Sequence, residues 1–83
     1  MNDSELMKIA KRCNHATKGP WVSYIEGRDH TSGSNFIRTQ GEDIELIGAS
    51  ITDQDFIAHA RQDIPCLIDE INRLRVIIAK QKR

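Results

Sequence analysis

The stretch between Trp21 and Gln40 holds the residues of this 83-residue chain whose types could do chemistry. Arg28 offers a planar fork of donors that suits a phosphate or a carboxylate. His30 can donate, accept or titrate near neutral pH, and Gly33 lets the backbone turn N–H groups toward an anion. The other candidate ligand-binding residues are hydroxyls, a second arginine and two aromatic side chains: Trp21, Tyr24, Thr31, Ser32, Ser34 and Arg38.

These residue types are typical of a site for a small anionic, nucleotide-derived ligand. A base that stacks on Trp21 or Tyr24 would gain about 1–3 kcal/mol, as in proteins that bind single strands. The alternative is an ordinary solvated loop, because polar, glycine-rich connections between strands are usually only turns. In that case Trp21 packs in the core.

Other chemistry has less support in the sequence. Asp55, His59 and Asp63 are spaced to share a helix face, but metal sites normally carry tighter Cys/His signatures. We therefore expect a solvated face, no metal and no cofactor. The sequence contains no nucleophile elbow, Walker loop, CxxC or HExxH motif, so we expect binding rather than catalysis. A small nucleotide hydrolase that pairs His30 with Glu26 stays open.

The composition excludes some classes of protein. Twelve basic and twelve acidic residues give a formal net charge of zero, whereas general binding of duplex nucleic acid needs a basic excess. The two cysteines show no disulfide framework, which is typical of a reducing compartment. The first residues are partly acidic and lack an apolar core, so we expect no signal segment, and no apolar run reaches membrane-spanning length. We expect a cytoplasmic protein with no membrane contact.

The elements that would position the loop form one small α+β domain over residues 1–83. An N-terminal helix is expected within 1–16, capped by Asp3 or Ser4. Gly19 and Pro20 end it. An antiparallel meander of three strands is expected at 21–26, 35–39 and 44–49, because the connections between these runs are short.

The last segment, 53–80, has a helical pattern. Thr52 and Asp55 resemble a capping box. Pro65 predicts a bend, with a short helix over 53–62 and a long helix over 64–80 that Asp63 caps.

The long helix carries a heptad pattern that predicts oligomerisation. Isoleucine recurs every seven residues with leucine three residues later, the preference of parallel two-stranded coiled coils. Two heptads are few, so the stripe could instead pack on the sheet and the first helix. The proposed oligomerisation residues are Ile64, Leu67, Ile71, Leu74 and Ile78.

Two stretches resemble motifs of small phage and prophage accessory proteins with the Ead-like layout. They are "ATKGPW", 16–21, and "DQDFIAHARQDIPCLIDEINRL", 53–74, which are similar to "ATPGPW" and "DFIAxARxDIPxLLxEIxRL". Lys18 departs from the pattern, since proline is common there. The resemblance implies an accessory phage protein and no catalytic residues.

Two functions follow as expectations. The first is a non-enzymatic homo-oligomeric binding module that sequesters a nucleotide-derived ligand, such as a host immune signal. The alternative is a protein–protein inhibitor or adaptor that acts through the C-terminal helix.

Overall fold

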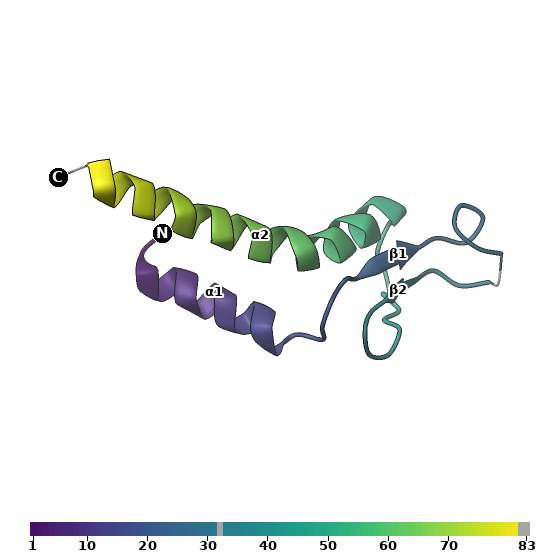
Figure 1. Ribbon diagram of the computed structural model, residues 1–83. Coiled ribbons are helices and arrows are strands. Elements are labelled where there is room, and N and C mark those ends of the chain that lie inside the picture. The colour runs from purple at the N-terminus through teal and green to yellow at the C-terminus, as the bar shows by residue number, and fades with distance from the viewer. Residues whose placement is uncertain (32, 82–83) are drawn as a thin grey trace.

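The chain folds into two helices and a β-hairpin in an elongated shape, 59 × 22 × 21 Å. A computed structural model describes residues 1–31 and 33–81. The elements are α1 (Asp3–His15), β1 (Val22–Tyr24), β2 (Phe36–Arg38) and α2 (Ile51–Gln81). In Figure 1, α1 lies beside the C-terminal half of α2, and the hairpin extends past the other end of α2. The expected α+β class is confirmed.

Helix α1 begins at Asp3 and is capped by Asn2, which precedes both predicted caps. Asn2 accepts the N–H of Glu5 at 2.8 Å, and the Glu5 carboxylate accepts the N–H of Asn2 at 3.2 Å. This reciprocal capping box satisfies two N–H groups that a helix start leaves open, so the expectation of an Asp3 or Ser4 cap was wrong. Leu6 is the buried residue of α1.

The sheet has two strands, which pair antiparallel with Tyr24 opposite Phe36. Beyond them, Ile37 and Ile44 exchange two backbone hydrogen bonds of 2.8 and 2.9 Å. Among the described residues, this single bridge is what remains of the expected third strand, 44–49. Farther along, Ile47 is fully exposed and Gly48 has a φ of 83°, so that stretch has neither the burial nor the extended backbone of a strand.

Helix α2 is continuous through Pro65, so the predicted division into two helices was wrong. It starts at Ile51 because Ser50 and Asp53 form its capping box, with hydrogen bonds of 3.0 and 3.1 Å. Thr52, the expected cap, lies in the first turn. A proline inside a helix costs about 3 kcal/mol. Tertiary contacts on both sides of Pro65 offset this cost, since Gln54 and Gln62 bond the hairpin side of the molecule before it and Arg75 bonds Asp3 of α1 after it.

The "ATKGPW" segment is the connection from α1 to β1, and it lies against α2. The carbonyl of Thr17 accepts the Arg61 Nε–H at 3.0 Å and the Trp21 indole N–H at 2.9 Å. A Cβ at Gly19 would lie 3.2 Å from the Gln62 side-chain oxygen. Glycine therefore permits this close approach to α2.

The core is small and lies between the hairpin, α1 and one side of α2. Its members are Leu6, Ile25, Ile37, Ala58 and Ile68. In the described part of the chain, no helix has both the length and the apolar character needed to cross a membrane.

Candidate functional site

Gln54 of α2 holds the two strands together from the helix side. It is buried, and its amide Nε2 donates to the Ser23 hydroxyl at 2.9 Å and to the backbone carbonyls of Phe36 and Tyr24 at 3.1 and 3.3 Å. A buried amide is stable there because its protons find acceptors. The side of the hairpin that carries Ser23 therefore packs against α2.

Gln62 lies two turns farther along α2. Its side-chain amide bonds both the backbone N–H and the backbone carbonyl of Trp21. Its Oε1 accepts the Trp21 N–H at 2.7 Å, and its Nε2 donates to the Trp21 carbonyl at 3.0 Å. Sequence reasoning missed both glutamines. The available signal was their spacing of four from Ala58 on either side, which puts all three on one face of the helix.

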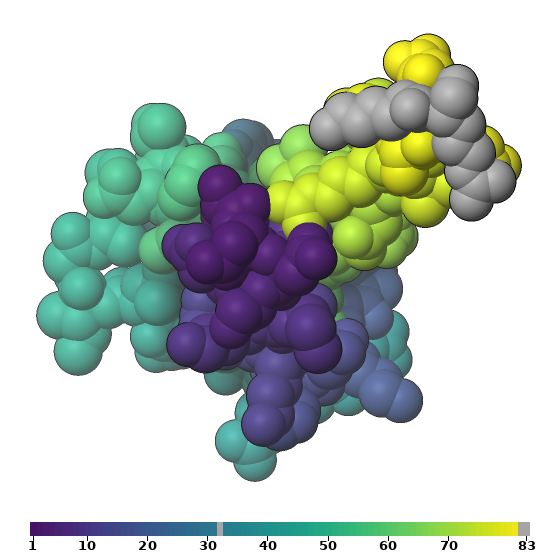
Figure 2. Space-filling model, turned by 90° about the vertical axis from the view of Figure 1, so that its left-hand side faces the viewer, coloured from purple at the N-terminus to yellow at the C-terminus, as the bar shows by residue number. Residues whose placement is uncertain are grey.

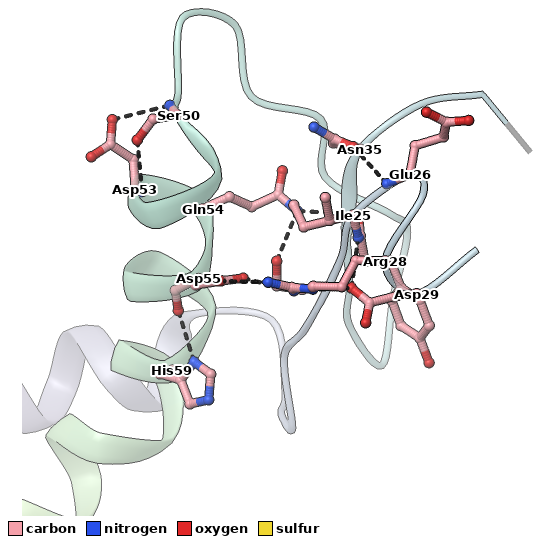
Figure 3. Close-up of polar contacts among 12 residues, drawn as sticks. Ile25, Glu26, Arg28, Asp29, Asn35, Ser50, Asp53, Gln54, Asp55 and His59 are labelled. Carbon is pink, nitrogen blue, oxygen red and sulfur yellow. Dashed lines mark hydrogen bonds and ion pairs between the residues drawn. The ribbon is translucent and has the colours of Figure 1, made fainter. Parts of the chain in front are cut away.

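Arg28, in the loop after β1, forms a two-point ion pair with Asp55 of α2 (Figure 3). Its Nη1 and Nη2 donate to the two Asp55 carboxylate oxygens at 2.8 and 3.0 Å, and its Nε donates to Asp29 at 2.9 Å. The hydrogen bonds from Arg28, with a smaller contribution from Ser23, lower the pKa of Asp55 to about 2. The same contacts raise the pKa of Arg28.

Asp29 also holds the loop itself in place. Its carboxylate accepts the backbone N–H of Ile25 at 2.8 Å, and this bond, followed by Arg28, lowers the pKa of Asp29. Gly27 has a φ of 85°, a conformation that glycine adopts without strain. The loop is therefore shaped by its own side chains.

This pairing changes the role expected for Arg28. Two carboxylates around one guanidinium leave an excess of negative charge, which disfavours an anionic ligand. Trp21 and Arg28 do share a shallow concavity of about 460 Å³ with Asp55 and His59.

His59 extends this polar group along α2. Its Nδ1 lies 2.8 Å from the backbone carbonyl of Asp55, four residues earlier. Within residues 1–31 and 33–81, no group of three His, Cys, Asp or Glu residues is arranged to hold a metal ion, the Asp55, His59 and Asp63 set included.

The opposite face of the hairpin carries a cluster of rings under a cation. Tyr24 and Phe36 are stacked with centroids 5.2 Å apart, and the His30 ring lies 5.2 Å from Phe36. The Arg38 guanidinium lies 5.0 Å from the Tyr24 centroid and 5.5 Å from that of Phe36, within cation–π range. Its nearest carboxylate, Asp43, is 3.9 Å away, and its side chain is 58 % exposed. We call Tyr24, His30, Phe36 and Arg38 the outward face.

The residues predicted to form one site are thus divided between two sides of the hairpin. Trp21 and Arg28 contact α2, while Tyr24, His30 and Arg38 are brought together on the outward face. Ser34 donates to Glu45 at 3.3 Å and Thr31 is exposed. Ser32 lies outside the described residues.

A third feature is an apolar stripe along α2, which we call the α2 seam. Because the helix is continuous, the predicted heptad pattern extends back by one more isoleucine and an alanine. Five of its large side chains are between 36 % and 60 % exposed, and Leu67 is the most exposed. The seam residues, spaced alternately by three and four, are Ile57, Ala60, Ile64, Leu67, Ile71, Leu74 and Ile78.

The seam is accessible near its middle and at its ends, whereas Ala60 and Ile71 are half-buried. Near its middle, Ala60, Ile64 and Leu67 line a concavity of about 530 Å³ with Phe56, which is also exposed. Toward its end, the last turns of α2 project from one side of the molecule in Figure 2. Helix α1 covers a different side of α2, at Ile68 and Arg75.

No protein-family model, curated protein or solved structure matches this chain. The resemblance to phage accessory proteins stays a prediction, and the functional argument depends on geometry.

Proposed function

We propose that this protein is a non-enzymatic binding module that binds a helical protein partner through the α2 seam. The observation that carries the proposal is the seam itself, an apolar stripe on a helix of 31 residues in which five isoleucine and leucine side chains are 36–60 % exposed. Soluble monomers rarely expose a large contiguous apolar patch, and such patches mark interaction sites. This function corresponds to the alternative that the sequence left open.

The energy available at the seam supports an interface. Complete burial of a leucine or isoleucine contributes about 1.5–3 kcal/mol. A partner that covers the exposed third to three-fifths of each side chain would gain about 1 kcal/mol per residue. Because the seam follows coiled-coil spacing, a second helix can place its own apolar side chains between these residues.

Thiol labelling in producing cells tests this proposal. A background with Cys13→Ser and Cys66→Ser removes the two native thiols, which are free. Leu67→Cys then reports on the seam. Asp69→Cys is the matched control, because two residues turn a helix by about 200° and place it on the far side.

We expect a membrane-permeant maleimide to label the control thiol at least tenfold faster than the seam thiol. Both thiols should react equally after denaturation. Equal labelling in the folded state would mean that the seam faces water, and would overturn the proposal.

A second candidate function is the binding of a small anionic ligand on the outward face. The observation that favours it is Arg38, an exposed cation held over the Tyr24 and Phe36 rings. A phosphate could bind the guanidinium edge while a base contacts the rings. Sequestration of a nucleotide signal in the cytoplasm, the use implied by the phage resemblance, remains part of this second proposal.

A further inference from the structure

We infer that the partner on the α2 seam is a second copy of this chain, bound parallel and in register as a two-stranded coiled coil. The inference rests on the proposed function and names its partner. It follows from the residue types along the seam, from the charges that flank it and from the place of α1.

The residue types favour a parallel pair. The seam places isoleucine at four successive a positions, Ile57, Ile64, Ile71 and Ile78, and leucine at two d positions, Leu67 and Leu74. A β-branched residue at a with leucine at d favours two parallel strands, whereas other arrangements of these residues shift the preference to trimers or tetramers. Ala60, at the remaining d position, keeps the pattern apolar.

The flanking charges agree with this arrangement. In a parallel pair, a residue at g lies near the partner's residue at e five positions later. Glu70 is at g and would meet Arg75 of the partner subunit, and the symmetric contact would form on the other side. Both side chains lie at the surface, that of Glu70 50 % exposed and that of Arg75 37 % exposed. Within one chain Glu70 is paired with Arg73 and Arg75 with Asp3, so the contact between copies would form in exchange for these surface ion pairs.

An antiparallel pair would oppose like charges. Two antiparallel alignments bring most of the seam into contact, and in both of them g faces g and e faces e. One alignment places Asp63 against the partner's Glu70. The other places Glu70 against the partner's Glu70 and Arg61 against the partner's Arg75. Like-charge contacts of this kind select against an orientation.

Helix α1 leaves room for the second copy. It packs on the side of α2 that holds Ile68, where Arg75 also bonds Asp3 and the Met1 carbonyl. The seam lies about a quarter-turn away from Ile68, as the separation of 100° per residue requires. A parallel pair would therefore place the two hairpins at the same end of the assembly.

Disulfide trapping of the full chain tests the inference. In the background without native thiols, Leu67→Cys and Leu74→Cys are oxidised separately under mild conditions. Only a parallel, in-register pair brings both positions next to their own copies, within the Cα separation of about 4.4–6.8 Å that a disulfide requires. Asp69→Cys is the control that should stay unlinked.

We expect each of the two seam variants to form a covalent dimer. If mixtures of Ile64→Cys or Ile57→Cys with Leu74→Cys cross-link while the single variants do not, the pair is antiparallel and the inference is wrong. A protein that sediments as a monomer and forms no disulfide also overturns it. In that case, protection of the Leu67→Cys thiol in cells would show that the seam binds a different protein, so the proposed function would survive. Loss of protection as well would overturn both.

Discussion

Arg28 and Asp55 stand 27 residues apart in the sequence and meet through two hydrogen bonds of 2.8 and 3.0 Å. The contact joins the loop after β1 to helix α2, beside the bonds that Gln54 and Gln62 make to the same hairpin. It gives the arginine of the most polar loop a structural role. The interaction surfaces that we propose lie elsewhere, on the outward face and on the α2 seam.

The Arg28–Asp55 pair predicts a pH dependence of stability. Because the folded pKa of Asp55 is lowered from 3.8 to about 2, its contribution is present above pH 3.8 and is lost as the pH falls through about 2. We expect Asp55→Asn to have a lower urea midpoint than the original protein at pH 6. The difference should shrink between pH 4 and about pH 2.

Asp63→Asn, an exposed carboxylate on the same helix, is the control and should leave the midpoint unchanged at both pH values. A midpoint difference for Asp55→Asn that stays constant down to pH 2 would show that the ion pair does not stabilise the fold.

Ile37 predicts where the hairpin core is most sensitive. It is 0 % exposed and lies on the face that covers α2. We expect Ile37→Ala to lower the free energy of unfolding by about 2–5 kcal/mol and Ile37→Val by about 0.5–1.5 kcal/mol. Chemical denaturation measures both. Ile47→Ala, at a fully exposed isoleucine, should change the free energy by less than about 0.5 kcal/mol. Equal effects at the two positions would contradict this packing.

The two hydrogen bonds of Gln62 to Trp21 predict that an amide at this position stabilises the fold more than a carboxylate does. Gln62→Glu keeps the acceptor for the Trp21 N–H but turns the donating nitrogen into an oxygen that faces the Trp21 carbonyl. We expect a loss of about 1–3 kcal/mol at pH 7, as for an unsatisfied partly buried group. Protonation of the introduced carboxyl at low pH should recover part of it. Gln40→Glu, on an exposed side chain, is the control. Equal stability of the two variants at pH 7 would argue against the contact with Trp21.

The outward face predicts which arginine a ligand needs. If a nucleotide binds there, Arg38→Ala should weaken it by about 10–100-fold, the effect of one charged hydrogen bond. Arg28→Ala, compared at a temperature where it is folded, should leave the affinity unchanged. Calorimetric titration with mono-, di- and cyclic nucleotides gives the measurement. No heat with any of them, or an effect at Arg28 alone, would eliminate this candidate.

Much of the architecture is predictable from local patterns in the sequence. Helix α1, both strands and the helical character of α2 follow from periodicity, β-propensity and the Gly-Pro break, and each was confirmed to within a few residues. The α2 seam was visible because isoleucine and leucine repeat at fixed spacing. The sequence underestimated the length of the seam, because Pro65 suggested that the helix breaks there. In the structure the helix is continuous, and it packs on the hairpin before Pro65 and on α1 after it.

The residues predicted to form one site are divided between two faces, because tertiary contacts and strand register decide which side chains meet. In the sequence Arg28 looks like a donor for an anionic ligand and Asp55 like part of a solvated helix face, and only the fold brings them together. The alternation of β1 then separates Trp21 and Ser23 from Tyr24. Sequence proximity indicated which side chains share a loop, but the strand register decides which of them share a face.

Photo-cross-linking in producing cells tests the central claim most directly. A benzophenone side chain is placed at Leu67 on the α2 seam or at Asp69 on the far side of the helix. We expect a strong cross-linked product from position 67, with the mass of two chains, and at most a trace from position 69. No product from position 67 would show that the seam contacts no protein, and equal yields from the two positions would show that the contact is not specific to the seam; either result would contradict the account.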